Sequence, residues 1–367
     1  MKVRYSYLAQ QFADCDDLWL QLKEFVKTGD FTLGAPLTEF ENKFANLIGT
    51  KYAIGVNSGT DAIKLSLVAA GVKAGDEVIT AANTFVATVG AIAEIGAIPK
   101  FVDCNDTFCM DVDLVEAAIN EKTTAIVPVH FTGYMTDMRI LMPIAKRHNL
   151  PVIEDACQSI LGEIDGRKAG TWGMTGAFSL HPLKNLNVWS DGGLIVTDDK
   201  KVAEHLRLIR NHGLVNRDEV QVLGYNSRLD TLQAVVGNWL IPQTEEIALK
   251  RIKNAAKYDA GLRAIPGIEI PPRPADFKVV YHLYMVFAEK RDELLAYCQA
   301  RGIEAKVHYP VPIYRQEALK AFGPIGKFPV TDRHARSVIS FPCDQHLTDE
   351  EINFVISTVA NFYAGVK

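Results

Sequence analysis

The chain has 367 residues, of which 48% are hydrophobic and 23% are charged, and its formal net charge is −5. Because this length exceeds the usual size of one hydrophobic core, we expect two domains. The composition is typical of a globular protein, and the small negative charge gives no reason to expect nucleic acid or an anionic membrane as a partner.

The N-terminus, the lengths of the apolar runs and the cysteines indicate the compartment of the protein. The N-terminus has no apolar signal segment and no apolar run is long enough to span a bilayer, so we expect a cytoplasmic protein. The six cysteines are scattered without a C-x-x-C pair, which predicts reduced and mostly buried thiols. We therefore expect neither a metal site nor a disulfide framework.

From Lys51 onward, predicted strands and helices alternate, which is the pattern of an α/β fold with a largely parallel sheet. In chain order the predicted strands are 52–56, 77–80, 99–102, 123–130, 151–156, 177–180 and 193–197. The predicted helices are 58–72, 85–95, 138–148 and 202–213.

The last third of the chain changes in composition. Residues 229–263 have helical composition interrupted at Pro242, and four prolines follow between 266 and 274. Beyond them we predict a shorter α/β set, with strands at 281–288 and 303–310 and helices at 291–302 and from Asp349. We place the boundary near residue 240, which gives domains of 1–240 and 241–367.

Ser58-Gly59-Thr60 follows a predicted strand and begins a predicted helix. Free backbone N–H groups, two hydroxyls and the positive end of the helix dipole converge there, which predicts a phosphate-binding site. The alternative is a simple helix N-cap at Ser58 or Thr60. Since the sequence has neither G-x-x-x-x-G-K-[ST] nor G-x-G-x-x-G, a nucleoside triphosphate or a dinucleotide is not expected.

Two side chains at the carboxyl ends of predicted strands are candidates for ligand contacts. Asp155 ends an internal strand, where a ligand with a protonated pyridine nitrogen would neutralise its carboxylate; alternatively, it caps the next turn. Phe85 follows another strand and either lies on a planar ring or belongs to the core. Glu154 points away from Asp155 on the strand, so we expect it to face a helix or solvent.

Lys184 lies on the connection between two short predicted strands. An amine held there can lose hydration, lower its pKa and attack a carbonyl carbon, although most lysines are simply solvated. A phosphate site, an aromatic ring, an acid at a strand end and an amine are the four contacts that pyridoxal 5′-phosphate (PLP) requires. The sequence therefore favours PLP as the cofactor.

Ordered motifs recur along nearly the whole chain and together carry a family resemblance. They include Ser58-Gly59-Thr60-Asp61-Ala62, Thr84-Phe85-Val86-Ala87-Thr88, Glu154-Asp155-Ala156 with Gln158, Lys184-Asn185-Leu186, Gly224-Tyr225-Asn226-Ser227-Arg228 and His308-Tyr309. With these motifs the chain resembles the sugar aminotransferases of the DegT/DnrJ/EryC1/StrS family. The resemblance implies an aspartate-aminotransferase-like (type I PLP) fold, with a mostly parallel seven-stranded sheet in the large domain and a smaller C-terminal α/β domain.

The resemblance also implies roles for individual residues. Lys184 would form the Schiff base with PLP, Asp155 would meet the pyridine nitrogen, Gln158 would lie near the ring hydroxyl, Phe85 would stack on the ring, and Gly59, Thr60 and Ser179 would surround the phosphate. The residue matching Asn226 reaches the phosphate of the neighbouring subunit in the family, which implies a homodimer with shared active sites.

The implied reaction is transamination of a nucleotide-diphosphate-linked 3-keto or 4-keto deoxyhexose, with glutamate as amino donor. Candidate substrate contacts are Arg210, His212, Arg228, His308 and Tyr309, although surface arginines are usually only solvated and the last two residues have packing as an equal alternative. The sugar, the aminated carbon and the nucleotide carrier are left open.

Two other functions remain as alternatives. Some relatives carry histidine in place of the lysine and dehydrate their sugar, and a PLP-binding regulatory protein without catalysis would share the fold. The retained Lys184 favours transamination. Asn187 and Ser190 stand where relatives often have glycine, and because glycine tolerates positive φ, these residues are expected to alter the lysine loop or the substrate pocket.

Overall fold

The N-terminal two-thirds of the chain is built around two hydrogen-bonded sheets, and the computed structural model describes residues 1–323 and 325–365. The sheets have the strand orders β1-β9-β8-β5 and β3-β2-β4. Ile126 bridges Val152 and Val129 bridges Asp155, both in parallel, so β4 and β5 lie side by side. The strands are β1 (Tyr52–Val56), β2 (Glu77–Ala81), β3 (Ile98–Val102), β4 (Thr123–Val127), β5 (Ile153–Asp155), β8 (Thr175–Ser179) and β9 (Gly193–Thr197).

Most strand pairs in these two sheets are parallel. β2 runs parallel to β3 and β4, and β5 runs parallel to β8. β9 is the exception, because it is antiparallel to both β1 and β8. The alternation of strands and helices therefore correctly predicted an α/β class with a largely parallel arrangement.

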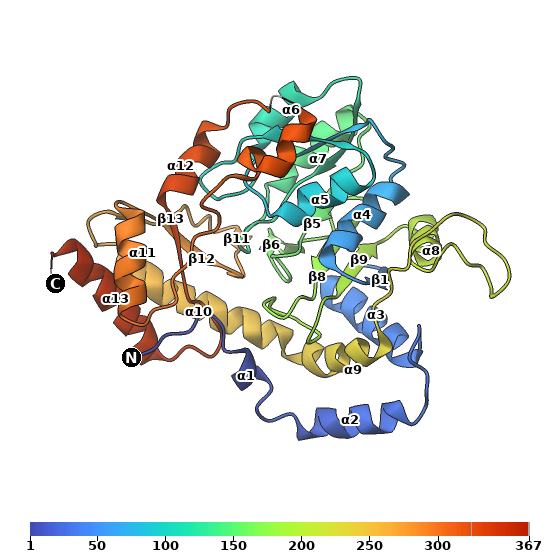
Figure 1. Cartoon of the computed structure of the whole chain (residues 1–367), viewed down its shortest axis with the longest axis horizontal. Coiled ribbons are helices and arrows are strands. Elements are labelled where there is room, and N and C mark those ends of the chain that lie inside the picture. Colours follow the sequence, from blue (N-terminus) through green and yellow to red (C-terminus); the bar gives the residue numbers. More distant parts are fainter. Residues whose placement is uncertain (324, 366–367) are drawn as a thin grey trace.

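Helices cover both faces of the sheets, and each face has its own hydrophobic core (Figure 1). Leu194 and Val196 of β9 belong to the core that includes α3 and α7, whereas Ile195 belongs to the core of α4, α5 and α8. Successive strand residues point to opposite faces, so three consecutive residues of β9, 194–196, are apolar. The helices are α3 (Ala35–Ile48), α4 (Gly59–Ala69), α5 (Val86–Glu94), η1 (Val112–Leu114), α6 (Val115–Ala118), α7 (Met138–Arg147) and α8 (Lys200–Ile209).

A helical segment connects the two parts of the chain. It consists of α9 (Thr231–Leu240), the 3-10 turn η2 (Ile241–Gln243) and α10 (Thr244–Leu262). Pro242 lies in η2, and since proline lacks an N–H and its ring clashes with the preceding turn, it interrupts the helix as the sequence predicted. The predicted domain boundary near residue 240 coincides with the end of α9, and we retain it as a proposal.

The C-terminal part has a separate core around an antiparallel sheet of order β10-β12-β13. Its elements are β10 (Ile268–Glu269), β12 (Tyr284–Ala288), α11 (Arg291–Ala300), η3 (Ile313–Arg315), η4 (Glu317–Phe322), α12 (Pro329–Ser337), β13 (Val338–Phe341) and α13 (Asp349–Tyr363). A fourth, small sheet joins the two parts of the chain through β11 (Phe277–Lys278), β6 (Glu163–Ile164) and β7 (Arg167–Lys168).

The predicted strand at 303–310 does not form. The stretch makes only isolated bridges, from Ile303 to Val3 and from Lys306 to Ser340. It ends at Pro310, which has no N–H to donate to a neighbouring strand. The segment is therefore an extended connection anchored at two points.

The first residues of the chain lie against the C-terminal part, although chain order placed them with the large domain. Val3 and Tyr7 belong to the C-terminal core, and Figure 1 shows the N-terminus beside α13. The chain then crosses through α1 (Leu8–Gln11) to α2 (Asp16–Val26), which packs on α9. The N-terminal segment thus spans both parts.

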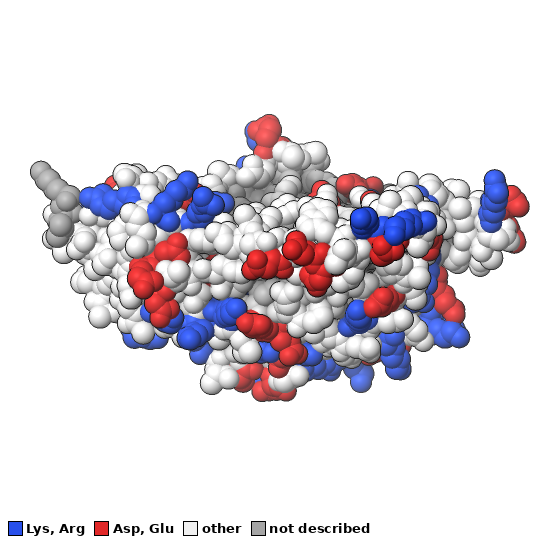
Figure 2. All heavy atoms as spheres, turned by 90° about the horizontal axis from the view of Figure 1, so that it is seen from below, with Lys and Arg blue, Asp and Glu red and all other residues white. Residues whose placement is uncertain are grey.

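The surface carries charges of both signs. Figure 2 shows basic and acidic side chains interspersed over the face seen from below. Within residues 1–323 and 325–365, no helix combines the length and the hydrophobicity that crossing a bilayer requires.

Candidate active site

A pocket of about 350 Å³ lies where β5 and β8 end and α4 begins. The carboxyl ends of parallel strands are where ligands bind in open α/β sheets. The N-terminal two-thirds contributes Ser58, Gly59, Thr60, Thr84, Phe85, Thr88, Asp155, Cys157, Gln158, Ser179, His181 and Lys184. The opposite wall comprises Tyr5 and Ser6 with Arg251, His282, Lys306, His308, Tyr309 and Asp344.

The start of α4 presents free donors to this pocket. Ser58 is the N-cap, and its side chain accepts a hydrogen bond from Asp61 N at 3.0 Å. No described group accepts a hydrogen bond from the backbone N–H of Gly59 or Thr60. A Cβ at Gly59 would lie 2.7 Å from the Ser179 Cβ atom and 2.9 Å from Cys157 Sγ. The capping role is therefore correct, and it leaves two N–H groups for an anion.

Asp155 is buried at the end of β5 with both carboxylate oxygens directed by neighbours. Thr88 donates to Oδ2 at 2.7 Å, and the Cys157 backbone N–H donates to Oδ1 at 3.2 Å. The second bond is the turn-capping contact that the structural alternative predicted. Within the described chain no cation lies at ion-pair distance from Asp155, so its charge is available to a ligand.

Lys184 lies on the loop between β8 and β9, half-buried at the pocket. Its Nζ has no hydrogen-bond or ion-pair partner among the residues that the structure describes. Burial lowers the pKa of Lys184, and the nearby Cys157 and Asp155 oppose this shift. A partly desolvated amine without a partner suits a nucleophile or base better than a solvated surface lysine does.

Three other predicted cofactor contacts also line the pocket. Phe85 is 49% exposed, which excludes the alternative of a core residue, and its ring centroid lies 5.9 Å from that of Tyr309. Gln158 Oε1 accepts a hydrogen bond from Thr132 N at 2.8 Å. Ser179 Oγ accepts one from His181 N at 3.3 Å. Each side chain is thus held at the pocket by the chain itself.

His308 and Tyr309, predicted as substrate contacts, line the opposite wall. Burial lowers the pKa of His308 to about 4, and the charges of Lys306 and Lys184 add to this shift. Burial also lowers the pKa of His282 well below its usual value. Both imidazoles are therefore neutral at pH 7 and available as hydrogen-bonding groups.

The prediction that Arg210 contacts substrate is contradicted by its surroundings. The guanidinium is buried, forms an ion pair with Glu41 and donates to the Gly55 carbonyl oxygen at 2.8 Å. It fastens α8 to α3 and β1 and does not line the pocket. Arg210 was expected near the substrate, but in the fold it is a buried structural residue.

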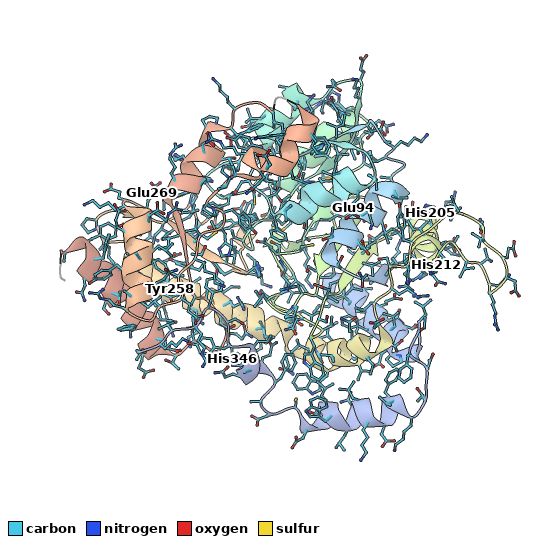
Figure 3. All side chains as sticks on the ribbon, in the orientation of Figure 1. Glu94, His205, His212, Tyr258, Glu269 and His346 are labelled. Carbon is cyan, nitrogen blue, oxygen red and sulfur yellow. The ribbon has the colours of Figure 1, made fainter. Side chains whose placement is uncertain are left out.

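His212, Asn226 and Arg228 also lie outside the pocket of their own chain. Figure 3 shows His212 beside α8, at the base of an outlying loop. Asn226 is exposed and forms a bridge with Asn211, whose side chain accepts a hydrogen bond from Arg228 at 2.9 Å. If they contact a ligand, it is not the ligand of their own pocket.

Several pocket residues were missed as individual contacts. Thr88 follows Thr84 at i+4, and this helical spacing of two polar residues beside Phe85 was a usable signal. Tyr5, Arg251, His282 and Lys306 come from segments far apart in sequence. No local pattern marks them, because only the tertiary fold brings them to the pocket.

Glu154 was expected to face a helix or solvent, and this expectation was wrong. It is fully buried and accepts hydrogen bonds from the backbone N–H groups of Gly170, Trp172 and Gly173 at 2.6–2.8 Å. His130 Nδ1 accepts from the Thr136 N–H, so His130 Nε2 carries the proton donated to Glu154 at 2.9 Å. Four donors replace the water that a carboxylate otherwise needs.

The loop around Lys184 does not need glycine at Asn187 or Ser190. Positive φ in this loop occurs at Trp189, with φ 70°, and not at the other two positions. Asn187 is buried and donates to Gln11 Oε1 at 3.3 Å, which ties the lysine loop to α1. Asn187 therefore alters what the loop packs against, and neither departure strains the backbone.

The residues present fit PLP. The unpaired N–H groups at α4 suit a phosphate, the uncompensated Asp155 suits a pyridinium nitrogen, and the unpartnered Lys184 amine suits an aldehyde. A side chain at Gly59 would fill the cradle, as the distances above require. Among the described residues, no cluster of three or more His, Cys, Asp or Glu side chains could hold a metal ion.

Comparisons with known proteins identify the family of the chain. A family model described as the DegT/DnrJ/EryC1/StrS aminotransferase family matches residues 16–360. The chain is 41% identical over 368 residues to the "Pleiotropic regulatory protein" of Geobacillus stearothermophilus, covering 99% of each chain. It is 39% identical over 334 residues to the dTDP-3-amino-3,4,6-trideoxy-alpha-D-glucose transaminase of Streptomyces venezuelae, covering 90% of this chain and 88% of that one.

A solved structure extends the agreement to the whole fold and the cofactor. The crystal structure of ntda from Bacillus subtilis, with bound cofactor PMP, superposes with a TM-score of 0.92 at 31% identity. The match covers 99% of this chain and 85% of that one. PMP is the amine form of PLP. The chain thus belongs to the DegT/DnrJ/EryC1/StrS aminotransferase family, and PLP is its cofactor.

Proposed function

We propose that this enzyme transfers an amino group from glutamate to the keto group of a nucleotide-diphosphate-linked deoxyhexose. The observation that carries the proposal is that Lys184 and Asp155, both without a charged partner in the described chain, share one pocket with the free N–H groups of α4. The name of the Streptomyces venezuelae transaminase, which specifies a nucleotide-linked 3-amino sugar, supports a nucleotide-linked amino sugar as the product. We propose a 3-keto or 4-keto sugar as the acceptor.

PLP supplies an aldehyde that takes up the amino group and a ring that withdraws electrons from the substrate carbon. Asp155, fixed by Thr88 and the Cys157 N–H, keeps the ring nitrogen protonated. Lys184 Nζ moves a proton from and to the substrate carbon, because its lowered pKa leaves more of the amine in the basic form near neutral pH.

We also propose that the active enzyme is a homodimer with shared sites. Asn226, His212 and Arg228 lie on the loop that follows α8, outside the pocket of their own chain. That loop exposes apolar residues, including Leu223 at 95% and Val220 at 55%. A second copy covering this loop would bury that surface and bring Asn226 to the partner's phosphate site.

The proposed architecture is the type I fold, with β1 to β5, β8 and β9 acting as one seven-stranded unit. The bridges between β4 and β5 support this description. We propose 1–240 as the large domain and 241–367 as the small domain, with the N-terminal residues tethered to the small one.

The test is amine transfer from glutamate to a panel of nucleotide-linked 3-keto and 4-keto sugars, read by mass spectrometry of the sugar. An amino sugar formed with one of them, and 2-oxoglutarate in equal amount, is the expected result. A keto-deoxy product without nitrogen would instead identify a dehydratase.

The name of the Geobacillus stearothermophilus relative favours a second candidate, a PLP-binding regulatory protein without catalysis. The intact arrangement of Lys184 and Asp155 speaks for catalysis, since cofactor binding alone does not require a free lysine base. A protein that retains PLP but produces no 2-oxoglutarate from glutamate with any keto sugar of the panel would favour the regulatory function.

A further inference from the structure

Lys306 places an unpaired positive charge on the pocket wall opposite the cofactor residues. It lines the pocket, and its ammonium group has no ion pair or hydrogen bond with any described residue. Its Nζ lies 4.3 Å from the centroid of the Tyr5 ring. A cation–π contact orients the ammonium group without neutralising its charge, so Lys306 can still bind an anion.

The backbone fixes Lys306 against β13. Lys306 N donates to the Ser340 carbonyl oxygen at 3.0 Å, and Ser340 N donates back to the Lys306 carbonyl oxygen at 2.8 Å. In an extended segment, residues two apart point to the same side, and both Lys306 and His308 line the pocket. His308 Nδ1 lies 2.8 Å from Ser340 Oγ, which anchors the segment a second time.

The charge of Lys306 acts on His308, which lines the same pocket as Lys184. Both Lys306 and Lys184 contribute to lowering the pKa of His308. The two ammonium groups therefore act on one imidazole from within a single pocket. An anionic substrate bound between the two ammonium groups would be attracted by both.

The acids that line the pocket do not neutralise Lys306. Asp344 lies 3.7 Å from Arg251 and accepts hydrogen bonds from Tyr7 N and His346 N. Asp155 and Asp191 also line the pocket, but neither is at ion-pair distance from Lys306. Since the free N–H groups of α4 already provide for the phosphate of the cofactor, Lys306 has no assigned anion.

We infer that Lys306, held over Tyr5, is the subsite for a carboxylate group of the substrate. This assignment deepens the proposed function and rests on it. The carboxylate belongs either to the amino donor or to an acidic acceptor sugar. In both cases Lys306 determines which substrates bind and takes no part in the proton transfer at Lys184.

The test compares Lys306→Met, which removes the charge but keeps an apolar stem over Tyr5, with Lys306→Arg, which keeps the charge. Lys253→Met is the matched control, because Lys253 is exposed on α10 and does not line the pocket. The first measurement is the rate of the half-reaction of PLP-loaded enzyme with glutamate, followed by the cofactor absorbance. The second is the same reaction run backward with 2-oxoglutarate, and the third is binding of glutarate.

We expect Lys306→Met to raise the glutamate KM and the glutarate Kd roughly tenfold or more, since a hydrogen bond to a charged group is lost. The limiting half-reaction rate should change little, which separates a binding subsite from a structural role. Lys306→Arg should stay within about threefold of the wild type, and Lys253→Met should match the wild type. Tyr5→Phe, which keeps the ring, should change glutarate binding only slightly.

A second arm identifies the source of the carboxylate. If Lys306→Met leaves glutamate and glutarate unchanged but weakens binding of a nucleotide-linked uronate relative to the neutral hexose, the carboxylate is that of the sugar. If Lys306→Met behaves as Lys253→Met does with all of these ligands, the subsite does not exist. Glutarate binding needs no catalysis, so a Lys306-dependent Kd in an enzyme that aminates no sugar would sink the proposed function and leave the subsite standing.

Discussion

Each wall of the pocket has bonded and free polar groups, and the two walls differ in which groups these are. Within the part of the chain that the structure describes, the first wall leaves Lys184 Nζ and two N–H groups of α4 free but fixes the side chains around Asp155. On the wall formed by β5 and the start of α5, Thr88 donates to Asp155 and Thr132 N donates to Gln158. On the opposite wall, His282 Nδ1 is buried without a hydrogen-bond partner in the described chain, and Lys306 has no counter-charge. Bonded groups are preorganised, whereas unbonded ones are satisfied by water or by a ligand.

This difference indicates a division of labour. A cofactor that stays bound through every turnover suits a wall whose side chains are fixed in advance. A substrate that enters and leaves suits a wall whose groups exchange water for ligand. Substitutions on the first wall should therefore affect the cofactor and the chemical step, and substitutions on the second should affect substrate affinity.

The largest effect is expected from Lys184→Ala. Because the variant lacks the amine that moves the proton, the turnover number should fall by roughly 10³-fold or more. The phosphate donors at α4 remain, so PLP should still bind, although without a covalent link. The turnover number is measured by release of 2-oxoglutarate, and bound PLP by absorbance after dialysis.

Lys253→Ala is the matched control, since it removes a lysine that is exposed on α10. Its turnover number should equal that of the wild type. A Lys184→Ala variant that still transaminates at a comparable rate would overturn the assignment of the base and, with it, the contrast between the two walls.

The main residues of the first wall were predictable because each belongs to a local pattern, whereas Thr88 was missed and Gln158 followed only from the family resemblance. Ser58 and Gly59 follow a strand and begin a helix, Asp155 ends an apolar strand, and Lys184 lies between two short strands. Such patterns fix backbone geometry over a few residues, and that geometry is enough to aim N–H groups and short side chains at one point.

The second wall was largely invisible in the sequence for a physical reason. Tyr5 and Lys306 lie 301 positions apart in the sequence, and their contact depends on the N-terminal segment lying against the C-terminal core. Arg210 was misassigned for the same reason, because its partner Glu41 lies 169 positions away. The sequence around an arginine shows that a positive charge is present. It does not show which carboxylate the tertiary fold places beside that charge.

Glu154→Gln should cause the next largest effect. The carboxylate accepts three backbone N–H groups and the His130 Nε2–H, and an amide offers one acceptor oxygen and two unwanted donors. We expect a loss of about 2–4 kcal/mol in the free energy of unfolding, measured by urea titration. Since Glu154 lies behind Asp155 on β5, cofactor affinity should fall as well.

Glu163→Gln provides the comparison for that substitution. Glu163 is half-buried and pairs with Lys278 at 2.7 Å, so the same chemical change should cost about 1 kcal/mol or less. Equal losses of unfolding free energy in the two variants would mean that the buried carboxylate of Glu154 does not stabilise the first wall.

His308 gives a pH-dependent test of the second wall. The pKa of His308 is lowered to about 4, whereas the unfolded chain has the ordinary value of about 6.5. Between these values the unfolded chain binds a proton that the folded chain does not, so stability falls as the pH drops from 6.5 to 4. Wild-type protein should lose on the order of 1–3 kcal/mol more than His308→Asn over this range.

Urea unfolding at a series of pH values measures the difference, with His205→Asn as the control, because His205 lies on α8 and does not line the pocket (Figure 3). That variant should retain the acid sensitivity of the wild type. If His308→Asn retains it too, the imidazole is not held neutral by its surroundings, and the second wall is less desolvated than the contrast requires.

The smallest effect compares two helix caps. Ser58 caps α4 at the pocket and Thr348 caps α13 far from it, each by accepting a backbone N–H, from Asp61 and Glu351 respectively. Either substitution to alanine should lower the free energy of unfolding by about 1 kcal/mol. Only Ser58→Ala should also weaken PLP binding, by a fewfold, because the cap aligns the N–H groups of Gly59 and Thr60.

Unfolding of the apo protein and PLP titration of the same preparations separate the two effects. A loss of PLP affinity in both variants would show that affinity follows global stability. A loss confined to Ser58→Ala ties it to the first turn of α4. In that case the first wall binds the phosphate through backbone N–H groups of α4 that the Ser58 hydroxyl aligns. The rest of the helix then contributes to PLP affinity only by holding this first turn in place.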